Sequence, residues 1–341
     1  MSYKLEVRTD VIDPHTYLEA ELNYKELLQA INDSGGYVLF QQIYKWFGGK
    51  SKGFREIKKL QDLLLLGSEQ LNNNKYVYLK TVALKYLKYK DFEGEVTELK
   101  INRLLNKPGF RPIMNSVYSF EYMMLENKYI NTNSSLQTLD IFIYNAREVF
   151  KNDRISNLHL GRIIKDEYVE QLKTKLKILG DRNAIFLKNY EPSNEFAKSN
   201  LEFVWFDFNQ ETDKNPVLRV LRLISKFLNN VGTTGKNNLL NCCNFSLEIV
   251  TLSEDRSTTL KGISDRAIGI IEKKNSQYLN SNTKTKENLV VSNIKHIEYK
   301  VFSDVEGYIK ISAKGESEFN FVNETVINRL QALKEHLKGG D

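Results

Sequence analysis

The segment that decides the fold covers residues 38–80 and reads VLFQQIYKWFGGKSKGFREIKKLQDLLLLGSEQLNNNKYVYLK. Residues 24–33 and 37–47 each predict a helix, because their apolar side chains recur at spacings of three and four. A glycine pair, Gly48-Gly49, follows the second helix and predicts a tight turn into a third. The segment is therefore expected to begin as short helices joined by turns.

A third helix is expected over about residues 51–66, with Ser51 capping its first turn through the hydroxyl. Its apolar residues have helical spacing and are expected to face inward, namely Phe54, Ile57, Leu60 and Leu64. Gly53 lies inside this helix, where glycine costs about 1 kcal/mol relative to alanine.

A β-hairpin should follow over about residues 68–80. Its turn is expected at Asn73-Asn74, since asparagine tolerates the positive φ that a tight turn needs. A short helix after Thr81 completes the pattern. The order of helix, helix, basic helix and hairpin predicts a winged helix-turn-helix, with residues 51–66 as its recognition helix and the hairpin as its wing.

Positive charge is concentrated in this segment. Residues 41–90 hold eleven Lys and Arg against three acids, a net charge of +8, whereas the whole chain carries +6. The other 291 residues therefore sum to −2. A local excess of this size is typical of a surface that binds a phosphate backbone, although a solvated lysine-rich helix face would give the same count.

Residues 22–90 resemble winged-helix proteins of the MarR-like kind. The resemblance is greatest to replication-relaxation-type proteins of plasmids and other mobile elements. The segments that carry it are LLQAIN, VLFQQIYKWFG, KGFREIKKLQDLLLL and NKYVYLKTVALKYL. The resemblance implies a DNA-binding regulator of transcription or replication on a mobile element. It extends only loosely to the second half of the chain.

The physical chemistry of the residues suggests a division of roles. Arg55 is the best candidate to read a base, because its guanidinium can bind guanine at two points. Lysines suit phosphates, which position a protein without specifying sequence. The expected DNA-binding set is Lys50, Ser51, Lys52, Arg55, Lys58, Lys59, Asn73, Asn74 and Lys75.

The rest of the chain predicts two further regions. Residues 93–182 read as helices and are expected to form a connector or dimerisation region. From residue 183 strands and helices alternate to residue 341, which indicates an α/β domain. The overall class is therefore α/β (α+β overall), with the winged helix assigned to residues 1–92.

Other chemistries have weaker signals. Asp207 and Glu248 follow or lie in predicted strands, as in a metal-dependent nuclease. However, the strand Ser246–Val250 lacks the Glu-x-Lys such a site needs. The four histidines are scattered, and Gly232–Lys236 lacks the full phosphate-loop pattern. We expect no enzymatic activity, no cofactor and no metal.

The sequence thus predicts a cytoplasmic protein that binds double-stranded DNA, as a homodimer, with no membrane span. The α/β domain is a candidate for binding a protein partner. Three alternatives remain open: a plasmid or phage replication initiator that covers repeated sites, a diverged nuclease, and an interaction module whose winged helix binds protein.

Overall fold

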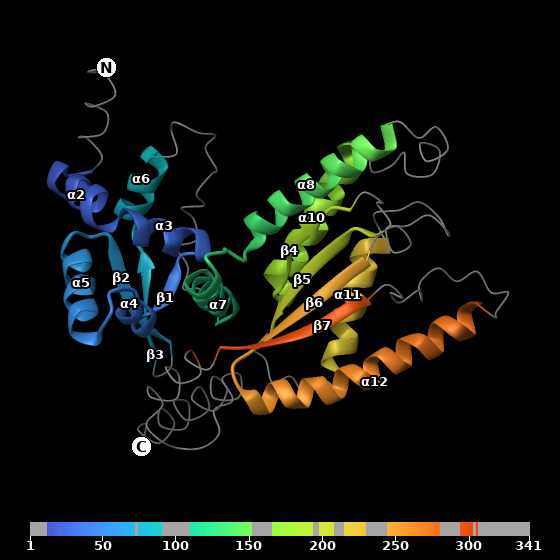
Figure 1. Cartoon of the computed structure of the whole chain (residues 1–341). Coiled ribbons are helices and arrows are strands. Elements are labelled where there is room, and N and C mark those ends of the chain that lie inside the picture. The colour runs from blue at the N-terminus through green and yellow to red at the C-terminus, as the bar shows by residue number, and fades with distance from the viewer. Residues whose placement is uncertain are drawn as a thin grey trace, which may run out of the picture. The chain divides into compact units, whose positions relative to one another are not determined.

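The computed structural model describes residues 12–71, 74–90, 110–151, 166–193, 198–207, 215–229, 244–279, 294–302 and Val305. These residues form two compact units, with Asn131 in the first and Thr132 in the second. Both units combine helices with a sheet, so the expected α/β class is confirmed at the level of mixed helix and strand (Figure 1).

The first unit is mainly helical, with one small sheet. Its elements are α2 (Pro14–Glu19), the π-helix η1 (Ala20–Tyr24), α3 (Lys25–Ser34), β1 (Tyr37–Leu39), α4 (Phe40–Trp46), α5 (Lys50–Asp62), β2 (Leu66–Leu71), β3 (Asn74–Leu79), α6 (Thr81–Lys90) and α7 (Phe110–Glu126).

The sheet of the first unit has the order β1-β3-β2, and both pairings are antiparallel. The expectation of one helix over residues 37–47 was wrong at its start. Tyr37–Leu39 pair instead with Tyr76–Tyr78 of β3, which lie about forty residues further along the chain. Backbone pairing with a distant strand thus outweighs the helical spacing of these three residues.

Two details of the third helix also differ from expectation. α5 begins at Lys50 with Gly49 as its N-cap, so Ser51 lies inside the helix and does not cap it. The helix ends at Asp62, because Leu64 adopts a positive φ of 58° and β2 starts two residues later. The turn at Gly48 is confirmed, since this glycine has a φ of +75°.

One hydrophobic core holds the first unit together. It contains Leu28 and Ile31 from α3, Ile43 from α4 and Ile57 and Leu60 from α5, all at most 1 % exposed. Phe54 and Leu64, in contrast, are more than half exposed, so their expected inward positions were wrong.

Helix α7 packs on the same unit as α4. The Gln42 amide donates to the Val117 carbonyl at 2.9 Å, and Lys45 Nζ lies 2.9 Å from Glu121 Oε1. These contacts group α7 with the first unit, whereas the later helices belong to the second. The expected connector, residues 93–182, is therefore shared between the two units.

The second unit places helices against a four-stranded sheet. Its elements are α8 (Thr132–Lys151), α10 (Asp166–Asn183), β4 (Ile185–Glu191), β5 (Asn200–Phe206), α11 (Pro216–Asn229), β6 (Asn244–Thr251), α12 (Glu254–Leu279) and β7 (Ile294–Val301). The alternation of strands and helices expected from residue 183 is present in this unit. Residues 306–341, which the sequence also assigns to the α/β domain, lie outside the described residues.

The strand order is β4-β5-β6-β7, antiparallel between β4 and β5 and parallel thereafter. Each parallel step is bridged by a helix, α11 and then α12, as parallel pairing requires. Phe203 and Leu247 contribute one face of the sheet to a core shared with Leu221 and Leu260 of these helices. Alternation along the strands therefore sends Val204 and Glu248 to the opposite face.

Candidate nucleic-acid interface

Helix α5 is fixed by a buried stripe that contains more than apolar side chains. Gly53, Glu56, Ile57 and Leu60 are its buried residues. Two of these four, a glycine and a glutamate, are not hydrophobic, so a search for apolar residues at helical spacing does not detect them. This is why the sequence pattern placed Phe54 on the inner face in their stead.

Gly53 marks the closest approach between α4 and α5. A Cβ atom at this position would lie 2.7 Å from Cα of Tyr44, closer than atoms in real proteins come. Only glycine therefore fits at this crossing without moving the backbone. The glycine that looked like a weak point of the helix sets the distance between two helices.

The predicted cations of α5 lie together on its outer side. Every predicted site residue of this helix is exposed, namely Lys50, Ser51, Lys52, Arg55, Lys58 and Lys59. Ser51, Arg55 and Lys58 are spaced by four and three residues, so they follow one line along the helix surface. Asp62 is the exposed acid of the same helix.

A buried carboxylate lies beneath two of these cations. Glu56 is 8 % exposed and accepts a hydrogen bond of 2.7 Å from the Tyr24 hydroxyl on η1. Arg55 Nε lies 3.4 Å from Glu56 Oε1, and Lys59 Nζ lies 3.6 Å from Oε2. The carboxylate thus ties both cations to the body of the unit, a link that the sequence pattern did not predict.

The charge state of Glu56 follows from these contacts. Burial raises the pKa of Glu56, but the Tyr24 hydrogen bond and the charges of Lys59 and Arg55 outweigh it and hold the pKa below the usual glutamate range. Burial and the contact with Glu56 also raise the pKa of Tyr24, so the hydroxyl remains a donor. At neutral pH the cluster therefore contains one carboxylate and two cations.

Because the pKa of Glu56 is lower in the folded chain, its contribution to stability is complete above the ordinary glutamate range and disappears as pH falls through the folded value. We expect the unfolding midpoint of the first unit, followed by Trp46 fluorescence in a Trp205→Phe background, to fall on acidification below about pH 4.5. In Glu56→Gln that fall should be smaller. The exposed Glu26→Gln variant is the control, and an unchanged slope in Glu56→Gln would contradict the assignment.

The hairpin supplies less of the predicted set. Lys75 is exposed on β3, as expected. Asn74 is the first residue of β3 and pairs with Leu71, so it belongs to a strand and not to the turn as predicted. Asn73 lies outside the described residues. Tyr76 donates to Glu69 across the hairpin at 3.0 Å, which braces the two strands beside α5.

No family model, curated protein or solved structure matches this chain. The geometry of its own residues therefore carries the functional argument.

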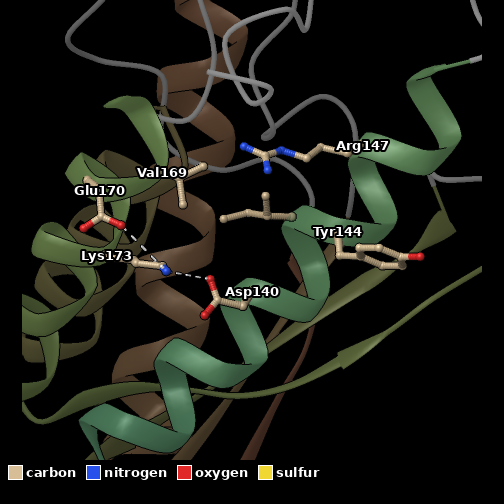
Figure 2. A pocket seen from close by; sticks show the side chains of 7 residues that line it. Asp140, Tyr144, Arg147, Val169, Glu170 and Lys173 are labelled. Atoms are coloured by element: carbon tan, nitrogen blue, oxygen red, sulfur yellow. Dashed lines mark ion pairs between the residues drawn. The ribbon is translucent and has the colours of Figure 1, made fainter. Parts of the chain in front are cut away.

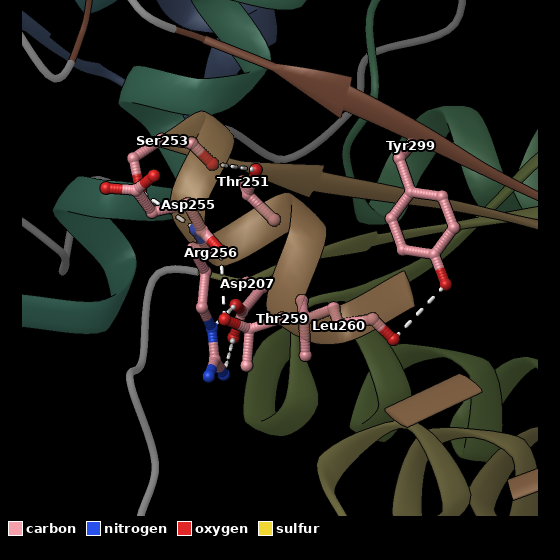
Figure 3. A network of polar contacts seen from close by, with 8 residues as sticks. All are labelled: Asp207, Thr251, Ser253, Asp255, Arg256, Thr259, Leu260 and Tyr299. Carbon is pink, nitrogen blue, oxygen red and sulfur yellow. Dashed lines mark hydrogen bonds and ion pairs between the residues drawn. The ribbon is translucent and has the colours of Figure 1, made fainter. Parts of the chain in front are cut away.

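The two acids considered for a nuclease are not brought together. Glu248 shares a face of the sheet with its register partner Val204. Asp207 comes directly after the last residue of β5, three residues beyond Val204, where the chain leaves the sheet. There Arg256, near the start of α12, holds it at 2.7 Å through Nε (Figure 3).

Each of these acids also has a basic partner. Asp207 and Arg256 have side chains that are 1 % and 15 % exposed, and a second guanidinium contact of 3.4 Å completes a fork. Glu248 lies 2.5 Å from Lys188 Nζ, which reaches it from β4 across β5. Spacing along one strand could not reveal this lysine, since it comes from a different strand sixty residues earlier. The described residues contain no group of three or more His, Cys, Asp or Glu arranged to hold a metal ion.

A cavity of about 280 Å³ lies between α8 and α10 (Figure 2). Lys173 points between Asp140 and Glu170, at 2.9 and 3.8 Å, and Arg147 lines the opposite part of the wall. The lining thus balances two cations against two acids.

Within the described ranges, no helix is long and apolar enough to cross a membrane.

Proposed function

We propose that the first unit is a winged helix-turn-helix that binds double-stranded DNA in the cytoplasm. α5 would enter the major groove, and β2–β3 would form the wing. The observation that carries the proposal is the exposed cationic side of α5, with five Lys or Arg residues on a helix whose other side is buried in the core.

The order of elements supports this assignment. α3, β1, α4 and α5 precede a two-stranded hairpin, and β1 closes a sheet of order β1-β3-β2. A helix that follows a short turn and projects an outer polar face is the arrangement that reads bases in helix-turn-helix proteins. Arg55 is 66 % exposed in its side chain and lies at the centre of that face.

Glu56 supports a role for Arg55 beyond simple charge. A long side chain loses conformational freedom when it binds, and a partner that already restrains it reduces this cost. The 3.4 Å contact with Glu56 restrains Arg55 at its Nε and leaves the terminal nitrogens of the guanidinium to face a guanine. We therefore propose Arg55 as the base reader, and Lys50, Lys52, Lys58, Lys59 and Lys75 as phosphate contacts.

The test is selection of a binding site from a randomised 20-bp duplex library, followed by anisotropy titrations. On the selected duplex, Arg55→Ala should bind about 10–100-fold more weakly, because one bidentate base contact is lost. On a duplex of random sequence, the loss of affinity caused by Arg55→Ala should be smaller. Lys58→Ala should reduce the slope of log affinity against log salt by about 0.9, as one phosphate contact disappears.

The matched control is Lys25→Ala, which removes one exposed cation of the same unit outside α5. It should leave both affinity and salt slope unchanged. If no duplex is enriched, or if Arg55→Ala and Lys25→Ala lose affinity equally, α5 is not a DNA reader. The alternative of a protein-binding winged helix would then take its place.

We further propose that the protein acts as a dimer in the control of transcription or replication on a mobile element. The alternative, a replication initiator, would be favoured by a second basic recognition helix, for which the cations of α11 are the candidates. Of Arg219, Arg222 and Lys226, Arg222 and Lys226 are exposed and Arg219 is half-buried, while the apolar residues of α11 pack into the core of the second unit. Footprint length separates the two, since a regulator covers one palindrome and an initiator covers several repeats.

A further inference from the structure

An aromatic side chain stands on the exposed cationic side of α5. Phe54 is 56 % exposed, whereas the inward apolar residues of the same helix, Ile57 and Leu60, are 1 % and 0 % exposed. One helical turn separates Phe54 from Lys50 on one side and from Lys58 on the other. The ring therefore lies among the residues that would contact a nucleic acid.

The core of the first unit does not account for this ring. Burial of a phenylalanine side chain stabilises a protein by about 1.5–3 kcal/mol, and more than half of that surface remains in water here. An exposed helix position among cations is ordinarily polar. The ring thus offers apolar area to a partner that must also be strongly anionic, because Lys50, Arg55 and Lys58 surround it.

The major groove of double-stranded DNA offers both an anionic surface and an apolar group. The phosphates match the lysines, and the C5 methyl group of thymine is the apolar group that the major groove displays. An apolar protein surface would match the ring, but its approach would require desolvation of the neighbouring cations.

We propose that Phe54 contacts a thymine methyl group and makes α5 select an A·T pair beside the guanine read by Arg55. This inference rests on the proposed DNA-binding function. It adds a specificity-determining residue that works by apolar contact, next to one that works by hydrogen bonds.

The experiment uses the full chain and the duplex enriched from the 20-bp library. Each thymine in turn is replaced by deoxyuridine, which pairs identically but lacks the methyl group. For the wild type, one position should lose about fourfold in affinity, the value of one buried methyl group. Phe54→Ala should bind the thymine duplex more weakly and show no loss at that position.

The control is Leu22→Ala, which truncates a 77 % exposed apolar side chain of η1 in the same unit. It should keep the thymine preference, and both variants should retain the wild-type thermal midpoint. The inference is overturned if the wild type ignores every uracil, or if Phe54→Ala loses affinity equally on both duplexes. Failure to enrich any duplex defeats the proposed function instead, so the two failures are distinguishable.

Discussion

Replacement of Arg256 by methionine should destabilise the second unit by about 3–5 kcal/mol. The variant removes the guanidinium that holds Asp207, whose side chain is 1 % exposed at the end of β5. A carboxylate at that depth loses far more by the removal of its ion-pair partner than an exposed one does, because water does not replace the lost contacts.

Urea unfolding of the full chain in a Trp46→Phe background measures this effect. The other tryptophan of the chain, Trp205, is 3 % exposed on β5, two residues before Asp207, and reports on the second unit alone. Lys295→Met is the matched control. It breaks a half-exposed pair with Glu191 at 3.9 Å and should cost under about 1 kcal/mol.

A companion variant separates charge burial from packing. Asp207→Leu combined with Arg256→Met removes both charges and should recover much of the lost stability, since an apolar pair needs no desolvation. If Arg256→Met costs no more than Lys295→Met, the fork at Asp207 does not hold β5 to α12.

Replacement of Gly53 by alanine should destabilise the first unit by about 1–3 kcal/mol, although alanine is the better helix former. The new Cβ would meet the backbone of Tyr44 at 2.7 Å, so α4 and α5 must separate. Because Ile57 and Leu60 leave the core with the moving helix, the loss exceeds the gain in helix propensity.

Gly262→Ala in α12 is the control, and it should change stability in the opposite direction. Gly262 is exposed, and no atom lies within 4 Å of its added Cβ, so this variant should be stabilised by about 0.5–1 kcal/mol. Hydrogen exchange over α4 and α5 measures the first variant, and exchange over α12 measures the control. Stabilisation by both substitutions would show that the helix crossing tolerates a methyl group.

The sequence predicted those features that depend on neighbours within one or two helical turns. The basic helix and the turn at Gly48 follow from local spacing and charge, whereas the expected cap at Ser51 was wrong. Phe54 was misplaced because the buried stripe of α5 uses Gly53 and Glu56. Neither residue is apolar, so their burial depends on Tyr44 and Tyr24, which come from other helices.

Features that depend on distant partners escaped prediction. β1 exists through its pairing with Tyr76–Tyr78, and three residues of helical spacing could not reveal that. In the second unit, Asp207 and Glu248 looked like companions because both accompany strands. Asp207 lies just after the end of β5 and Glu248 lies within β6, and each is paired with a basic side chain from an element far away in sequence, Arg256 and Lys188 respectively.

The parallel pairing in the second sheet affects how the chain reaches this structure. Asn200 pairs with Asn244, and Ser246 with His296, so long loops must close before either ladder forms. The hairpin of the first unit closes between Leu71 and Asn74, at a much smaller loss of chain entropy. Since non-local pairing slows folding, we expect this hairpin to form before the parallel ladders of the second sheet.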